Sequence, residues 1–119
     1  YAARRYQDVL KYRPDMHEAR INLATLHRKH KHYSGAEEEL REVIRRNCYS
    51  FDAHYNLANV LVEAGKPEEA LQEYKFCLKL KPRNAMVHNN LGVLFLERKY
   101  PDEALQEFRT AARLAPSNQ

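Results

Sequence analysis

The sequence predicts an all-α protein made of repeated helix pairs, and its composition and its internal period are the two observations that support this prediction. Of the 119 residues, 44% are hydrophobic and 30% are charged, while only 3 are Gly and 5 are Pro. Such a chain is too apolar to stay disordered and too poor in turn residues for a β-sandwich. At an offset of 34 residues, identical residues recur three times at three positions: Asn22, Asn56 and Asn90; Leu23, Leu57 and Leu91; Ala36, Ala70 and Ala104. A period of this length indicates a repeat architecture.

The period divides the chain into three full units and a leading segment. The units span residues 17–50, 51–84 and 85–118, and we expect residues 1–16 to form the second helix of a unit whose first helix is missing. We therefore treat residues 1–119 as one domain, and as a fragment of a longer array. The last unit presents an apolar stripe that needs a cover: Leu105, Phe108, Ala112 and Leu114. We expect further repeats, or copies stacked end to end, to cover it.

Apolar residues within each unit recur at steps of three and four, which is typical of two amphipathic helices. In the middle unit they are Leu57, Val60, Leu61 and Ala64 on the first helix, and Ala70, Leu71, Tyr74, Cys77 and Leu78 on the second. The same spacing predicts helices over residues 1–13, 17–30, 35–47, 51–64, 68–81, 85–98 and 102–115.

Turn residues separate the predicted helices. Gly65 can adopt the left-handed conformation that closes a helix, and Pro67 fits the first turn of the next helix. Pro101 occupies the same place in the last unit, whereas the first unit offers Ser34 as an N-cap. A proline, which lacks the N–H donor needed to continue a helix, follows three of the second helices: Pro14, Pro82 and Pro116.

These features resemble the tetratricopeptide repeat, a helix–turn–helix unit of 34 residues, over the whole chain. The last unit matches the family pattern best, at Leu91, Gly92, Phe95, Ala104, Phe108, Ala111 and Pro116. The family's early tryptophan is replaced in all three units, by Arg20, His54 and His88. The resemblance implies a right-handed superhelix of antiparallel helix pairs, a solenoid whose first helices line the concave side.

The concave face holds the candidate binding site. Asn22, Asn56 and Asn90 recur at one position of the three first helices, and an amide offers both donors and an acceptor to the backbone of an extended ligand. This arrangement resembles the asparagine ladder of the protein O-linked N-acetylglucosamine transferase, although these amides could instead bond to helix ends or neighbouring repeats. We predict a groove for a partner peptide with these site residues: Asn22, Tyr55, Asn56, Asn59, Met86, Asn89, Asn90 and Val93.

The residues of the groove also bear on other kinds of ligand and function. A clamp for a terminal carboxylate is disfavoured, because the basic residues that such a resemblance requires are replaced by Ile21, Met86 and Asn90. Arg28 and Lys29 at one end of the groove, with Glu63 and Glu97 farther along, suit a ligand with acidic and basic segments in that order. Two alternatives stay open: the substrate-recognition arm of a larger enzyme such as a glycosyltransferase, and a scaffold that self-associates end to end.

Several classes of function lack support in the sequence. It contains no phosphate-binding loop, dinucleotide-binding, nucleophile-elbow or zinc-protease motif, so we expect neither catalysis nor a cofactor. The histidines of the segment 27–32 lie among basic residues that would repel a metal ion, and Cys77 falls at a packing position. Alternating charges and a net charge of +4 argue against nucleic-acid binding. The apolar runs are too short for direct membrane insertion.

Overall fold

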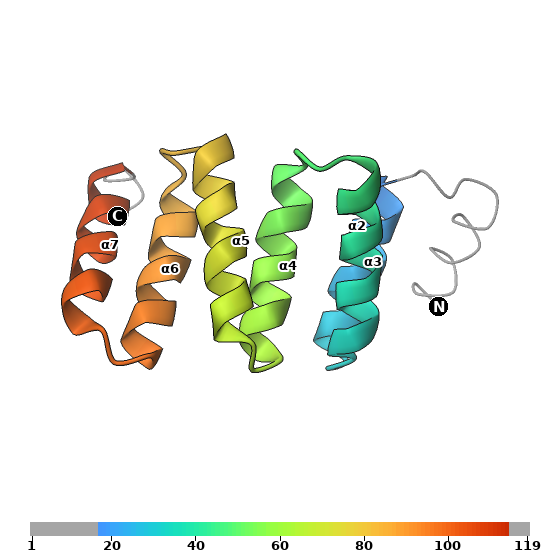
Figure 1. Ribbon diagram of the computed structural model, residues 1–119, viewed down its shortest axis with the longest axis horizontal. Coiled ribbons are helices and arrows are strands. Elements are labelled where there is room, and N and C mark those ends of the chain that lie inside the picture. Colours follow the sequence, from blue (N-terminus) through green and yellow to red (C-terminus); the bar gives the residue numbers. More distant parts are fainter. Residues whose placement is uncertain (1–16, 115–119) are drawn as a thin grey trace.

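The computed structural model describes residues 17–114 and folds them into six helices, with no strand in this range (Figure 1). The helices are α2 (His17–Lys29), α3 (Tyr33–Arg46), α4 (Phe51–Glu63), α5 (Pro67–Leu80), α6 (Ala85–Glu97) and α7 (Pro101–Leu114). These bounds confirm the helices predicted between residues 17 and 114 to within two residues at each end. The helix predicted over residues 1–13, and residue 115, lie outside the described residues.

The turn inside each helix pair has the same backbone geometry. Lys31, Gly65 and Lys99 all adopt positive φ, at 63°, 80° and 66°. The amide of the following residue then donates to a carbonyl five residues back in every case: His32 to His27 at 2.7 Å, Lys66 to Leu61 at 2.8 Å and Tyr100 to Phe95 at 2.8 Å. This pairing is the Schellman arrangement that satisfies the last carbonyls of a helix. The left-handed position predicted at Gly65 is therefore common to all three turns, glycine or not.

The first turn corrects one prediction from the sequence. Helix α3 begins at Tyr33 after His32, so Ser34 lies inside the helix and is not its N-cap. The reason is that Lys31 takes the left-handed conformation, so the turn ends and the helix begins two residues earlier than a cap at Ser34 would require. Gly35 is then a packing residue, because a Cβ atom there would lie 3.2 Å from the His27 ring.

The helices that open the second and third units are capped by side chains. Ser50 Oγ accepts a hydrogen bond from the amide of Ala53 at 3.2 Å, and Asn84 Oδ1 accepts one from the amide of Val87 at 3.0 Å. Each cap satisfies an amide that has no partner within its own helix. Because both caps follow a break after a second helix, they fix where α4 and α6 start.

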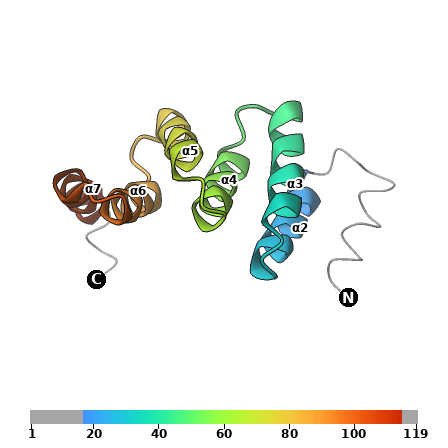
Figure 2. The same cartoon turned by 60° about the horizontal axis from the view of Figure 1, so that its bottom comes forward.

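The helix pairs stack side by side, as the two views show (Figures 1 and 2). One continuous core runs through the stack, and its largest fully buried side chains include Leu40, Leu57, Leu61, Tyr74 and Val87. A small residue lets α6 and α7 approach closely, because a Cβ atom at Gly92 would lie only 2.8 Å from the Phe108 ring. No single pair could bury these faces alone, so the layers depend on one another.

A polar pair joins the two helices of each unit at the position where the family has tryptophan. The pairs stand 34 residues apart: Arg20 with Glu39 at 2.8 Å, His54 with Glu73 at 2.5 Å and His88 with Glu107 at 2.7 Å. The other ring nitrogen of each histidine contacts a backbone carbonyl oxygen of the preceding loop at 2.9 Å. These residues therefore join both helices of a unit, and in two units also the loop before them.

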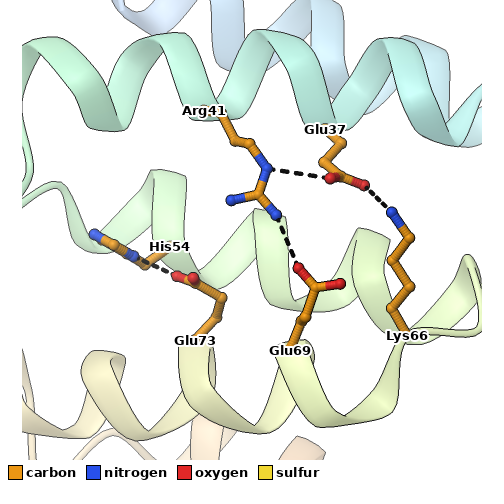
Figure 3. Close-up of polar contacts among 6 residues, drawn as sticks. All are labelled: Glu37, Arg41, His54, Lys66, Glu69 and Glu73. Atoms are coloured by element: carbon orange, nitrogen blue, oxygen red, sulfur yellow. Dashed lines mark hydrogen bonds and ion pairs between the residues drawn. The ribbon is translucent and has the colours of Figure 1, made fainter.

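Ion pairs connect the first unit to the second between α3 and α5 (Figure 3). Glu37 accepts hydrogen bonds from Arg41 and Lys66, both at 3.1 Å, and Arg41 also donates to Glu69 at 3.2 Å. Partial burial of Glu37 opposes its ionisation, but the two cations together lower the pKa of Glu37 below its usual value. Each exposed pair contributes little alone, so this cluster sets the register of the layers more than their stability.

Candidate functional site

A hollow of about 460 Å³, here called the groove, lies along the first helices of the three units. Its lining comes from four helices: Arg28 of α2; Tyr55, Asn56, Asn59, Val62 and Glu63 of α4; Tyr74 of α5; Asn90, Val93 and Leu94 of α6. On α4 the lining residues follow the steps of three and four that place side chains on one helix face. The first helices therefore share a common inner face, to which the second helices contribute only Tyr74.

A hydrogen-bond network connects the third unit to the second at the bottom of the groove. The side-chain nitrogen of Asn90 donates to the hydroxyl of Tyr55 at 2.9 Å and to the amide oxygen of Asn59 at 3.2 Å. The hydroxyl of Tyr74 donates to the same oxygen of Asn59. Tyr74 is only 2% exposed, and this burial raises the pKa of its hydroxyl well above the usual value. The phenol therefore stays protonated and acts as a donor, which holds the amide of Asn59 in place.

Asn56 stands in register with Asn90 but is bonded differently. Its side-chain nitrogen donates to the backbone oxygen of Asp52, one turn earlier on α4, at 2.8 Å. Its side-chain oxygen accepts no hydrogen bond from any residue in the range 17–114. Asn56 is half-buried in the groove lining, so this acceptor is available to a ligand.

The structure brings five of the eight predicted site residues together in the groove: Tyr55, Asn56, Asn59, Asn90 and Val93. Asn22 is half-buried on α2 but is not part of the groove lining. Met86 and Asn89 line another hollow, here called the end hollow, of about 410 Å³ between α6 and α7. Its other lining residues are Ala85, Asn90, Phe108, Ala111 and Ala112.

Two features of the groove were not predicted from the sequence. Tyr74 reaches the groove from a second helix. The sequence signal that could have identified it is its hydroxyl, which its equivalents at the repeat offset, Leu40 and Phe108, lack. Arg28, expected to offer a free positive charge, instead pairs with Glu63 across α2 and α4, with 2.7 Å between Nε and Oε2. The two residues together form one end of the groove.

A third hollow, of about 380 Å³, adjoins the groove at this ion pair and is here called the basic hollow. It is lined by Thr25, Arg28, Lys29, Lys31, Tyr33 and Glu63. Arg28 and Glu63 line both hollows, so the two hollows meet at this ion pair.

The thiols and histidines form no cluster of metal-ligating side chains in the part of the chain that the structure describes. Cys77 is fully buried, and this burial, together with the nearby charge of Glu73, raises the pKa of its thiol to about 12. Cys48 is exposed. Across residues 17–114, no three His, Cys, Asp or Glu side chains come together as metal ligands would, and no helix is long and apolar enough to cross a bilayer.

Comparison with known proteins identifies the fold. A model of the tetratricopeptide repeat matches residues 2–50, 22–75 and 55–119. Solved structures of MamA superpose on almost the whole chain: one has a TM-score of 0.86 at 20% identity over 96% of this chain and 67% of its own. MamA from Desulfovibrio magneticus RS-1, residues 41 to the end, gives 0.88 at 21% identity over 98% of this chain and 66% of its own. No curated protein sequence gives a significant match. At this low identity, the likeness to MamA shows a shared fold alone. Because the repeat model matches nearly every residue, the chain belongs to the tetratricopeptide repeat family.

Proposed function

We propose that this chain is a non-catalytic interaction module that holds a peptide segment of a partner protein in the groove. The observation that carries the proposal is the lining of the groove, where amide groups of α4 and α6 and phenol groups of α4 and α5 lie beside apolar side chains. Tetratricopeptide repeats are in general protein-interaction scaffolds, which agrees with this reading.

The groove supplies both kinds of contact that an extended peptide needs. The free side-chain oxygen of Asn56 can accept a hydrogen bond from a backbone amide of the ligand. Val62 and Val93 provide apolar surface beside it. Bonds to the ligand backbone give affinity, while the apolar contacts select side chains.

The network beneath the groove supports binding by keeping these groups in place. Asn59 and Asn90 are bonded to each other and to two tyrosines, so their side chains have little freedom to lose when a ligand arrives. A site ordered in advance binds more tightly, since ordering side chains on binding costs about 0.5–1.5 kcal/mol each.

The test uses random peptides of about ten residues displayed on phage and selected on the intact chain, with affinities then measured for synthetic versions. We expect Asn56→Ala to weaken binding about tenfold, because it removes a bond to the ligand and no bond between helices. Gln72→Ala, which removes an exposed amide from α5, is the matched control and should change affinity less than twofold. Unchanged affinity in Asn56→Ala would contradict the assigned contact, and failure to select any groove-binding peptide would contradict the function.

A second candidate, end-to-end self-association, is favoured by the end hollow. The corresponding surface of α4 and α5 is covered by α6, which buries Tyr74 and Cys77, whereas Leu105 of α7 is 48% exposed. Sedimentation at increasing concentration tests this candidate. A mass that rises with concentration in the parent chain and stays monomeric in Leu105→Glu supports stacking, and a constant monomer in both excludes it.

A further inference from the structure

The inner face changes its chemistry from one unit to the next. Three positions, compared at the repeat offset, show the change: Thr25, Asn59 and Val93; Arg28, Val62 and Leu96; Lys29, Glu63 and Glu97. The end of α2 therefore carries hydroxyl and basic groups. At the same positions α4 carries an amide, an apolar side chain and a carboxylate, and α6 carries two apolar side chains followed by the carboxylate of Glu97. Val93 is 41% exposed and Leu96 is 55% exposed, so these apolar side chains of α6 are open to solvent.

The basic hollow holds two positive charges that are not neutralised within residues 17–114. Arg28 is paired with Glu63, but Lys29 and Lys31 are exposed and make no ion pair with any described residue. The hydroxyl groups of Thr25 and Tyr33 line the same hollow. Thr25 already donates to the backbone of Ile21 at 3.0 Å, and Arg28 uses its Nε for Glu63. The donors left in the hollow are the two ammonium groups, the phenol and the terminal N–H groups of Arg28. Such a set of donors suits a carboxylate.

The two hollows lie next to each other and meet at the Arg28–Glu63 pair, which lines both. A ligand that enters at Lys29 and Lys31 passes the Arg28–Glu63 pair, then crosses the amides of α4 and reaches Val93 on α6. The positive charge is confined to one end of this path and is followed by apolar surface. A nucleic-acid strand would instead need basic groups along its whole length.

We propose that the partner segment is a peptide with acidic side chains at the end that lies in the basic hollow, followed by apolar side chains at the end that lies on α6. This inference rests on the proposed function, since it names the chemistry and the direction of the peptide that the groove binds. Lys29 and Lys31 bind the acidic end, while Val93 and Leu96 contact the apolar end.

The experiment continues from the peptides selected on the intact chain. We expect them to be enriched in Asp or Glu at one end and in apolar residues at the other. A selected peptide should bind at least about tenfold more tightly than a peptide with the same residues in reverse order. The double variant Lys29→Glu, Lys31→Glu should lose about tenfold or more in affinity, and added salt should reduce the difference. Lys75→Glu, Lys79→Glu, which makes the same charge change on α5, should stay within twofold of the parent.

The outcomes separate this inference from the function on which it rests. Circular dichroism first establishes that both double variants remain folded. Selected peptides that bind less tightly to Asn56→Ala but carry no acidic end would overturn the inference and leave the proposed function standing. The same holds if the selected peptides bind the double variant Lys29→Glu, Lys31→Glu as tightly as the parent. Equal binding of forward and reversed peptides overturns the direction. Inorganic phosphate and a short RNA are also tested as competitors of the bound acidic peptide. If either displaces it at a lower concentration than unlabelled peptide does, the proposal that a protein partner occupies this hollow is overturned.

Discussion

The network beneath the groove can be tested by removing its donor and its acceptor separately. Tyr74→Phe removes the hydroxyl that donates to Asn59, and Asn59→Ala removes the acceptor. Although both changes break the same hydrogen bond, they leave different groups behind. The side-chain oxygen of Asn59 still accepts from Asn90 after Tyr74→Phe. After Asn59→Ala, the Tyr74 hydroxyl is left without this acceptor in a side chain that is only 2% exposed.

This difference sets the expected magnitudes. Tyr74→Phe loses one neutral hydrogen bond and should lower the free energy of unfolding by about 1 kcal/mol. Asn59→Ala loses the same bond and also the bond from Asn90, which is worth about 1 kcal/mol more. It also strands a buried donor, which costs a further 1–3 kcal/mol or so. We therefore expect Asn59→Ala to cost about 3–5 kcal/mol. In the double variant the stranded hydroxyl is gone, so it should be no less stable than Asn59→Ala alone.

Urea unfolding followed by circular dichroism gives the four free energies, and the slope with urea concentration shows whether each variant unfolds over the same surface. The double-mutant cycle should give a coupling of about 1–2 kcal/mol between Tyr74 and Asn59. Strict additivity of the two single changes, or a larger loss from Tyr74→Phe than from Asn59→Ala, would refute the bond between these side chains.

Three further predictions follow from burial and backbone geometry. In the folded chain a disulfide reagent such as dithionitrobenzoate should modify Cys48 within minutes and Cys77 only after unfolding, because Cys77 is fully buried; rapid modification of both thiols would contradict the packing. Since the pKa of Cys77 is raised from 9.0 to about 12, the unfolded chain binds fewer protons in this window, so stability should fall as pH rises from 9 toward 12. The urea midpoint should fall less steeply with pH in Cys77→Ala, and equal slopes would argue against this origin. Lys99→Gly should raise the free energy of unfolding by about 0.5 kcal/mol, and Gly65→Ala should lower it by about 1 kcal/mol, because both positions have positive φ; urea unfolding decides, and opposite signs would refute it.

The helices could be predicted because the determinants are local and recur three times. Steps of three and four in apolar residues fix the buried face of each helix, and Pro67 and Pro101 mark where two of them begin. The turn after α2 was harder to predict, because its left-handed residue is Lys31 and the sequence there offers Ser34 as an alternative start. Aligning Lys31 with Gly65 at the repeat offset is the signal that identifies it.

The candidate site could be predicted only in part, because hydrogen bonds between units decide which polar groups remain free. A helical pattern places Tyr55, Asn56 and Asn59 on α4, but it does not reveal that Tyr74 reaches Asn59 from the neighbouring helix. Pairing between units also neutralises Arg28, whose partner Glu63 is 35 residues away. The sequence therefore identifies which residues lie on the inner face, but not which of their polar groups are already hydrogen-bonded or ion-paired.

The register explains why two equivalent asparagines differ, and this difference assigns their roles. Asn90 meets Tyr55 and Asn59 on the preceding first helix, and both oxygens accept its amide hydrogens. The equivalents of these acceptors for Asn56 are Ile21, which has no side-chain acceptor, and Thr25, whose hydroxyl donates to the backbone of Ile21. Asn56 consequently bonds to its own helix, and within residues 17–114 its side-chain oxygen has no partner in the groove. Two identical residues in register therefore differ in their contacts. Asn90 bonds to the neighbouring unit, so Asn56 is the one of the two whose side chain we propose for the ligand.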